Sequence, residues 1–263
     1  MPRQARKSSG TGIYHVMMRG INHQNIFEEP EDYYQFLNTL DMMSQSYESD
    51  GSLLGRNYTL YAYCLMSNHI HLLIREREDN IGMAIKRIAS SYVYYYNHKY
   101  SRDGHLFRER YKSEPVNDMA YFVTLLRYIH QNPVKAGMVA EVKDYEFSSW
   151  DEYIDKNCTL FPLCDTRTVL NRIPFSELNE LVNEPLSDDI VCLDIEDASK
   201  GRPSDDQVMM LIKEKTGATN SCAFQQLPAD IKKSLLIELK GKRASLRQLE
   251  RLTGISKSMI FRM

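Results

Sequence analysis

The sequence predicts an α+β fold, in which a ferredoxin-like antiparallel sheet with helices is followed by a small all-α module of helix-turn-helix type. Two observations lead to this prediction. Strand and helix patterns follow one another in the order strand, helix, hairpin, helix, strand, helix over the first half of the chain. The composition then changes near residue 203, after which only helical patterns follow. A chain of 263 residues can hold one domain of ordinary size and a smaller one.

The first elements are a strand, a helix and a hairpin. Residues 11–20 have the β-branched and aromatic content of a strand, and residues 31–47 carry apolar residues at helical spacing. Two strand-like stretches between residues 57 and 76 then flank the dipeptide of Ser67 and Asn68. This arrangement predicts a tight hairpin.

A helix, a strand and a further helix complete the predicted sheet domain. Asn80 can cap a helix that continues to Tyr96. Residues 106–116 have the pattern of a short strand that carries arginines. Residues 118–132 are expected to form a helix that stops at Pro133, because proline cannot continue a helix without losing a hydrogen bond.

The second strand of the hairpin contains two histidines one residue apart. His69 and His71 share one face of the strand, whereas Ile70, Leu72 and Ile74 face the opposite layer. Two imidazoles on one face of a rigid element can converge on a divalent metal. The alternative is a buried histidine pair held by hydrogen bonds.

The helix before Pro133 offers further groups for such a site. Tyr128 and Asn132 are four residues apart and therefore share a helical face. The amide oxygen of Asn132 can bind a cation, and Gln131 is the competing ligand. Tyr128 can supply a nucleophile. The alternative is that Tyr128 is a core aromatic residue and Asn132 a helix stop.

Charge is distributed unevenly along the chain, although the net charge is only −2. Residues 80–135 carry nine Lys or Arg against four Asp or Glu, and residues 207–263 carry eleven against four. Residues 176–200 carry eight acids and one lysine. Basic regions of this kind are typical of polyanion binding or of solvated helix faces. The candidate phosphate contacts are Arg87, Arg108, Arg110 and Lys112.

The composition also limits the protein class and its location. Five cysteines are scattered without a C-x-x-C spacing, which argues against a disulfide framework or a zinc ribbon. No apolar run approaches the eighteen or so residues that a membrane span requires, and no secretory signal is evident. A cytoplasmic protein without a membrane partner is expected.

The last part of the chain is expected to be helical. Helices are predicted at residues 205–215 and 229–239, followed by a compact pair with Gly254 in its turn. Ser245 and Ser256 are the expected caps of that pair. The spacing resembles a helix-turn-helix, although the second helix is short for reading a DNA groove.

The predicted domain boundaries follow from these patterns. Residues 1–153 are expected to form the sheet domain and residues 154–203 an acidic connecting region. Residues 204–263 are expected to form the helical, DNA-binding module.

Four motifs together resemble the single-tyrosine HUH transposases, which comprise small insertion-sequence enzymes and REP-associated tyrosine transposases. They occur in the order "YHVMMRG", "AYCLMSNHIHLLI", "GHLFRERYKS" and "LLRYIHQNPVKAG" and cover about residues 12–153. The resemblance implies an HUH endonuclease domain in which His69, His71 and Asn132 hold Mg²⁺ or Mn²⁺. It also implies that Tyr128 is the nucleophile.

The resemblance further implies a transposase-type endonuclease and strand transferase that acts on single-stranded or hairpin DNA. Its intermediate would be a 5′-phosphotyrosine. The metal identity rests on the resemblance, because imidazole also accepts Zn²⁺. Relatives act as homodimers or alone, so a homodimer stays open. The main alternative is a non-catalytic DNA-binding regulator that uses the C-terminal helices, and a second alternative is a metal hydrolase without a covalent intermediate.

Overall fold

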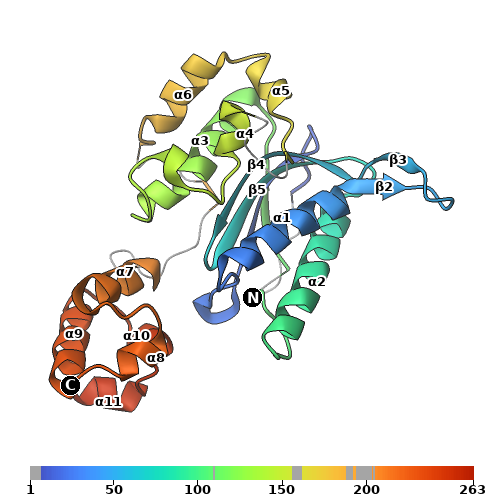
Figure 1. The fold of residues 1–263 in the computed structure, drawn as a ribbon. Coiled ribbons are helices and arrows are strands. Elements are labelled where there is room, and N and C mark those ends of the chain that lie inside the picture. The colour runs from blue at the N-terminus through green and yellow to red at the C-terminus, as the bar shows by residue number, and fades with distance from the viewer. Residues whose placement is uncertain (1–6, 109, 156–161, 188–191, 194–202, 204) are drawn as a thin grey trace. The chain divides into compact units, whose positions relative to one another are not determined.

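The computed structural model describes a chain that divides into two compact units (Figure 1). The first comprises Met1–Lys135 and Val139–Asp194, and the second comprises Ala136–Met138 and Ile195–Met263. The described residues are 7–108, 110–155, 162–187, 192–193, 203 and 205–263.

A four-stranded antiparallel sheet forms the centre of the first unit. The strand order is β4 (Tyr58–Met66), β5 (His69–Glu76), β1 (Ile13–Arg19) and β6 (Lys112–Pro115). The first strand therefore lies between the third and fourth strands of the sheet in chain order, which is the ferredoxin-like arrangement. The predicted fold class is confirmed.

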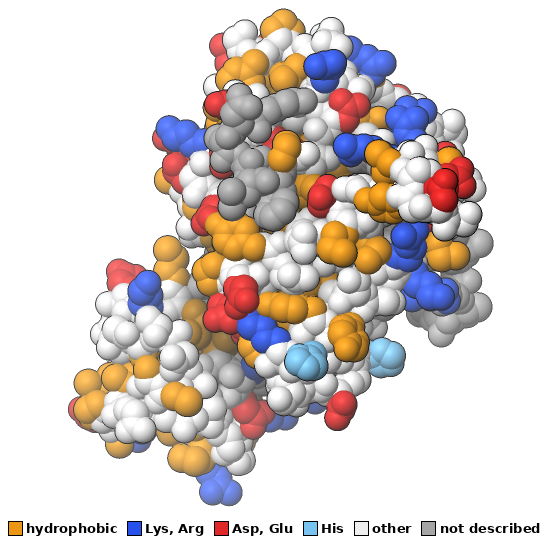
Figure 2. Space-filling view, turned by 45° about the vertical axis from the view of Figure 1, so that its right-hand side comes forward, with side chains coloured by type: hydrophobic (Ala, Val, Ile, Leu, Met, Phe, Trp, Pro, Cys, Tyr) orange, Lys and Arg blue, Asp and Glu red, His pale blue; other side chains and the backbone are white. Residues whose placement is uncertain are grey.

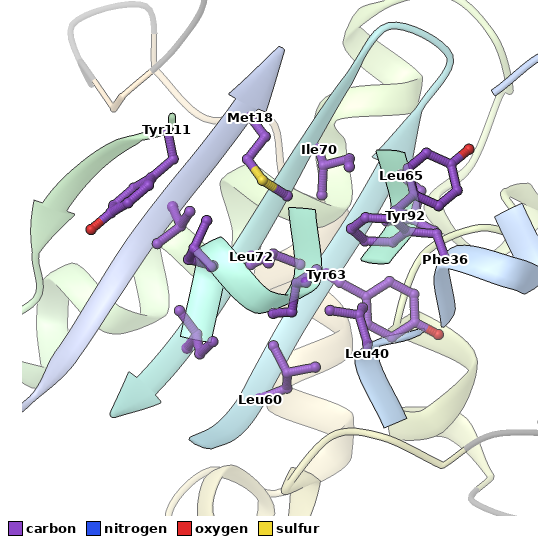
Figure 3. Packing of buried hydrophobic residues seen from close by; sticks show 14 of the residues in the cluster. Met18, Phe36, Leu40, Leu60, Tyr63, Leu65, Ile70, Leu72, Tyr92 and Tyr111 are labelled. Atoms are coloured by element: carbon purple, nitrogen blue, oxygen red, sulfur yellow. The ribbon is translucent and has the colours of Figure 1, made fainter. Parts of the chain in front are cut away.

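Two helices, α1 (Pro30–Ser44) and α2 (Ile81–Lys99), cover one face of this sheet (Figure 1). The side chain of Asn80 accepts a hydrogen bond from the backbone N–H of Met83, as predicted for a cap. Figure 3 shows the core between sheet and helices, where Ile70 and Leu72 meet residues such as Phe36, Leu40 and Tyr92. The apolar positions of β5 thus bury one face, and the two histidines are left on the other.

The opposite face carries α3 (Met119–Lys135), with α4 (Trp150–Ile154), α5 (Thr166–Leu170) and α6 (Phe175–Asn183) nearby (Figure 1). The prediction that the third helix stops at Pro133 is wrong, because α3 continues through it to Lys135. Pro133 lies in the last turn, where the helix loses a single backbone hydrogen bond.

Two other predictions about element bounds need correction. Among the described residues of the strand expected at 106–116, Lys112–Pro115 pairs along β1, and Phe107 makes just an isolated bridge to Gly20. The helix expected to reach residue 47 ends at Ser44. A small ribbon of β2 (Gln45–Tyr47) and β3 (Leu53–Arg56) follows it, and two short 3₁₀ turns lie at Ile21–His23 and Val142–Asp144.

The second unit contains only helices among its described residues. They are α7 (Asp205–Thr216), α8 (Ser221–Gln225), α9 (Ala229–Gly241), α10 (Leu246–Thr253) and α11 (Lys257–Arg262). Their shared core includes Ile212, Phe224, Leu236, Leu249 and Ile260, which are fully buried.

The predicted turn between α10 and α11 has the expected backbone. Gly254 has φ +69°, the left-handed conformation that glycine adopts without strain. Ser245 caps α10 through the N–H of Gln248, as predicted. Ser256 occupies the cap position of α11 but makes no capping hydrogen bond, and Glu250 accepts the N–H of Lys257 instead.

The segment at residues 154–203, expected as a connecting region, contains folded structure. Both α5 and α6 belong to the first unit, and Leu178 and Val182 of α6 are fully buried. Much of the remaining acidic segment lies outside the described residues. In the part of the chain that the structure describes, no helix is both long and apolar enough to cross a membrane.

Candidate active site

Three adjacent strands direct polar side chains to the sheet face that α3 covers. Met17 of β1 pairs with His71 and Arg19 with His69, so His15 shares this face. His15 also pairs directly with Glu114 of β6. The site is therefore set by strand register, which brings together residues far apart in the sequence.

A chain of hydrogen bonds links these side chains across the sheet. Nδ1 of His15 lies 2.7 Å from Oε1 of Glu114, and Nε2 of His15 lies 2.9 Å from Nδ1 of His71. His15 and His71 are both fully buried, and their rings stack with centroids 5.1 Å apart. The other nitrogen of His71, Nε2, is buried without a hydrogen-bond partner among the described residues.

His69 completes the pair that the sequence predicts. Its ring centroid lies 5.1 Å from that of His71, and its Nδ1 lies 2.6 Å from the amide oxygen of Asn68. Burial lowers the pKa of His69 to about 3, assisted by the positive charge of Arg19. Burial, with the neighbouring His69 and His15, also holds the pKa of His71 well below its usual value. Both rings are neutral at pH 7, the form that binds metals.

Tyr128 meets the histidines from α3. Its ring centroid lies 5.6 Å from that of His71 and 5.9 Å from that of His15, with both ring pairs close to perpendicular. The tyrosine is almost fully buried, and the ammonium group of Lys135 lies 5.2 Å from its ring centroid. The structure thus brings the predicted tyrosine to the predicted histidines.

The two amides of α3 have different surroundings. Gln131 donates to the carbonyls of Val182 and Glu184 at 2.7 and 2.6 Å, and it accepts the N–H of Leu186. Its side chain therefore holds the chain that follows α6. Asn132 donates its amide nitrogen to the carbonyl of Tyr128 at 2.9 Å, so its oxygen is the atom suited to a cation.

The chemistry of these side chains suits a divalent cation. Two neutral imidazoles and an amide oxygen would leave coordination positions open for water or phosphate, although imidazole nitrogens suit Zn²⁺ as well as Mn²⁺ or Mg²⁺. The buried Nε2 of His71, which has no hydrogen-bond partner among the described residues, is the observation that favours ligation. No group of three or more His, Cys, Asp or Glu suited to a metal occurs within the described ranges, so the amide would be needed.

The predicted phosphate contacts lie on different parts of the first unit. Lys112 pairs with Met17 in the sheet and so shares the histidine face. Arg87 lies on α2, which covers the other face, and pairs with Asp79 at 2.8 Å. Arg108 and Arg110 are exposed. In Figure 2, the described Lys and Arg side chains are interspersed with acidic and apolar ones. Any phosphate binding on that face therefore depends on local clusters.

One such cluster lines a groove of about 830 Å³ between α2 and residues 105–108 and 110–111. Arg108, Arg110 and Lys86 contribute the cations, and Tyr94 contributes a ring that is 77% exposed. Cations beside an exposed aromatic ring suit a single-stranded nucleic acid.

Several residues near the two histidines could not be predicted from the sequence patterns. His15, Arg19 and Glu114 reach the histidine face through strand pairing, which no local spacing reveals. Lys135 lies seven residues after Tyr128, a helical spacing that could have indicated a shared face.

Tyr92 and Tyr96 are the competing tyrosines, and both lie in the opposite core. Tyr92 donates to the carbonyl of Ile26 at 2.5 Å and Tyr96 to Glu28 at 2.8 Å. Both tyrosines are therefore packing residues of the core between the sheet and α2.

Part of the chain is similar to known transposases. Residues 9–132 match the family model described as "Transposase IS200 like". A protein of Haemophilus influenzae named "Putative REP-associated tyrosine transposase" is 28% identical over 112 residues. That match covers 38% of this chain and 62% of the relative, which is less than two thirds of the relative's length.

A solved structure of a REP-associated tyrosine transposase bound to a REP hairpin is also similar. It has 18% sequence identity and a TM-score of 0.47, and the match covers 63% of this chain and 93% of the other.

Proposed function

The chain belongs to the single-tyrosine HUH transposase family, the IS200-like transposases, and from this premise we propose that it cuts and rejoins single-stranded DNA. The substrate is a strand with a hairpin beside the cleavage position. Tyr128 is the nucleophile, and His69, His71 and Asn132 hold Mg²⁺ or Mn²⁺.

The proposed step exchanges one phosphodiester for another. The phenol oxygen of Tyr128 forms a bond to phosphorus, and the bond from phosphorus to the 3′ oxygen breaks. The product is a 5′-phosphotyrosine and a free 3′ hydroxyl. The phenol loses one proton and the departing oxygen gains one, so the step consumes no net proton. Because the bond energy is kept, a DNA hydroxyl can reverse it without ATP.

The bound cation would supply charge neutralisation at the phosphate and the departing oxygen. The protein's own contribution is position. The sheet fixes both imidazoles, and α3 carries Tyr128 against them. The buried face also keeps the neutral imidazoles away from bulk water, where they would be protonated more readily.

The observation that carries this proposal is the 5.6 Å between the ring centroids of Tyr128 and His71. A phenol on a ring this close to His71 could reach a phosphate bound to a cation that His71 holds. Two histidines alone would fit many metal sites, and a tyrosine alone would fit a packed core. Their joint placement supports a nuclease that forms a covalent intermediate.

The DNA strand is proposed to run over the cations of the first unit. Lys112 would contact phosphate on the histidine face, and Arg108 and Arg110 would do so in the groove beside α2. Arg87 would join them by exchanging its ion pair with Asp79 for a phosphate, since a surface pair of this kind contributes at most about 1 kcal/mol.

The test of the nucleophile uses a labelled single-stranded hairpin oligonucleotide with Mn²⁺. We expect an adduct that survives denaturing electrophoresis, that requires the metal, and that is lost in Tyr128→Phe. Tyr92→Phe is the matched control, because it also removes a buried hydroxyl from the first unit. An adduct that persists in Tyr128→Phe would show that another residue is the nucleophile. Turnover without any adduct would indicate a hydrolase.

The test of the strand path measures affinity against salt concentration. Each lost phosphate contact lowers the slope of log affinity against log salt by about 0.7 for a single strand. We expect Arg108→Ala with Arg110→Ala to lower the slope by about 1.4. Lys143→Ala is the control, because that exposed lysine pairs with Glu141 outside the groove. An unchanged slope in the double variant would exclude the groove.

A DNA-binding regulator without catalysis is the second candidate. The observation that favours it is a separate helical unit whose last two helices meet at a glycine turn. Such a protein would bind duplex DNA and form no adduct with the hairpin substrate.

A further inference from the structure

We propose that His15 and Glu114 are positioning residues that set which nitrogen of His71 carries its proton. This inference rests on the proposed metal site. It assigns a role to a buried hydrogen-bond chain that runs from β6 through β1 to β5. The chain would direct the lone pair of Nε2 of His71 toward the cation.

Strand register creates the chain. His15 lies directly opposite Glu114, and it lies diagonally from His71, whose partner in β1 is Met17. The two contacts measure 2.7 and 2.9 Å, which lie within the normal range of hydrogen bonds. Because every backbone position is fixed by the sheet, the three side chains have little freedom to pair otherwise.

Counting protons along the chain gives the tautomer. Burial alone would raise the pKa of Glu114, but the hydrogen bond and the charge attraction from His15, with the hydrogen bonds from Leu193 and Tyr121, lower it overall. The carboxylate can only accept, so Nδ1 of His15 donates to it. The neutral form of His15 then has an acceptor at Nε2, and the hydrogen in the next contact belongs to Nδ1 of His71. A doubly protonated His15 would instead donate to Nδ1 of His71 and leave the hydrogen of His71 on Nε2, which is the outcome that the first test detects.

The consequence for His71 is that its Nε2 has no hydrogen. This is the atom that is buried without a hydrogen-bond partner among the described residues. An arrangement in which a second group holds Nδ1–H and leaves Nε2 for the metal is the common way to orient a histidine ligand. His69 follows the same rule, since the amide oxygen of Asn68 accepts its Nδ1–H.

A histidine with a purely structural role looks different in this protein. His130 is also fully buried, but both of its nitrogens have partners: the carbonyl of Leu126 and the hydroxyl of Ser149, each at 2.8 Å. Leaving a buried ring nitrogen without a partner costs free energy. His71 therefore has the pattern of a ligand, and His130 provides the internal comparison.

The first test reads the tautomer directly in the metal-free protein. Long-range ¹H–¹⁵N correlation spectra at pH 7.5 distinguish the two neutral forms of each histidine. We expect His71 to carry its proton on Nδ1 in the wild-type chain. A proton on Nε2 of His71 would overturn the proposal, whether or not the protein binds metal or cuts DNA.

The second test measures Mn²⁺ affinity by electron paramagnetic resonance of the free ion. His15→Phe keeps a ring of similar size but removes the acceptor. We expect it to raise the dissociation constant about 10- to 100-fold. His130→Phe is the control, because it deletes a buried, twice-bonded imidazole and should change the constant less than about twofold.

The results separate the two proposals. A folded His15→Phe that binds Mn²⁺ as tightly as the wild type would exclude the positioning role and leave the proposed function standing. A wild-type chain that binds no Mn²⁺ would remove the metal site itself, and the spectrum of His71 would still decide the tautomer.

Discussion

Two neighbouring amide side chains on α3 have different roles, one structural and one proposed for metal binding. Gln131 makes three hydrogen bonds to Val182, Glu184 and Leu186, whereas the amide nitrogen of Asn132 returns to its own helix. The sequence left these two residues as competing ligands. The contacts now assign Gln131 a structural role, and Asn132 stays the proposed ligand.

This division predicts opposite phenotypes for two alanine variants. Asn132→Ala should weaken Mn²⁺ binding about tenfold or more, because one ligand oxygen is lost, with little change in stability. Gln131→Ala should keep the affinity and lower the free energy of unfolding by about 1–3 kcal/mol, because buried backbone groups lose their partner. Calorimetric titration and urea unfolding measure the two quantities. The assignment fails if the phenotypes are exchanged.

The buried His130 predicts a pH-dependent stability. Burial lowers its pKa to about 4, against the opposing effect of its hydrogen bond to Leu126. Between pH 6.5 and 4 the unfolded chain takes up a proton that the folded chain does not. The stabilising contribution is therefore complete above pH 6.5 and is lost as the pH falls toward 4.

The magnitude follows from the shift. The difference in unfolding free energy between wild type and His130→Phe should shrink by roughly 3 kcal/mol from pH 7.5 to 4. Urea titrations across this range measure it. A difference that does not vary with pH would show that the imidazole is not held neutral by burial.

For single residues, the sequence predicts which side chains share a face of a strand or helix, because this depends on local spacing. The alternation of β5 gives the shared face of His69 and His71, and the helical period gives the shared face of Tyr128 and Asn132. His15 and Glu114 could not be found this way. They belong to strands about 100 residues apart, and only the pairing of β1 with β6 joins them.

The helices and strands differ in how well local sequence signals predicted their bounds. The capped helix α2 and the hairpin of β4 and β5 agree with their predictions because caps and turns act over a few residues. The sixth strand is shorter than predicted because its pairing with β1 begins only at Lys112, opposite Met17, and such long-range pairing is not visible in local sequence. The run of α3 through Pro133 depends on tertiary packing, which local propensity does not include.

The end of β1 supplies a prediction at this scale. A Cβ added to Gly20 would lie 2.2 Å from the backbone oxygen of Gln24, closer than any tolerated contact. Gly20 also donates its N–H to Asn68 at the hairpin turn, so the backbone there has little room to move. Gly20→Ala should lower the unfolding free energy by about 1–3 kcal/mol.

The matched substitution is Gly55→Ala in β3, where an added Cβ meets nothing within 4 Å. It should leave stability unchanged or raise it slightly, because alanine reduces the freedom of the unfolded chain. Urea midpoints compare the two variants. Equal effects would mean that the close approach at Gly20 relaxes without cost.

At the scale of the whole molecule, each unit has its own core. The first is built on one sheet, and the second on apolar side chains of α7 to α11. The second unit is small, so its stability is expected to be marginal and sensitive to a single core residue. Charge counting along the sequence indicated a division in this region, but it could not show that α5 and α6 pack into the first unit.

Because the two units have separate cores, we expect a substitution that destabilises the second unit to leave the proposed catalysis of the first unit unchanged. Leu249 is fully buried in the second unit, and Leu249→Ala should remove about 2–5 kcal/mol from it. In the full chain, we expect an early unfolding transition to appear in circular dichroism, with Mn²⁺ affinity and adduct formation on single-stranded DNA retained. Affinity for duplex DNA should fall, because the proposed helix-turn-helix would be lost. If adduct formation fell together with the second unit, the active site would depend on it, and catalysis could not be assigned to the first unit alone.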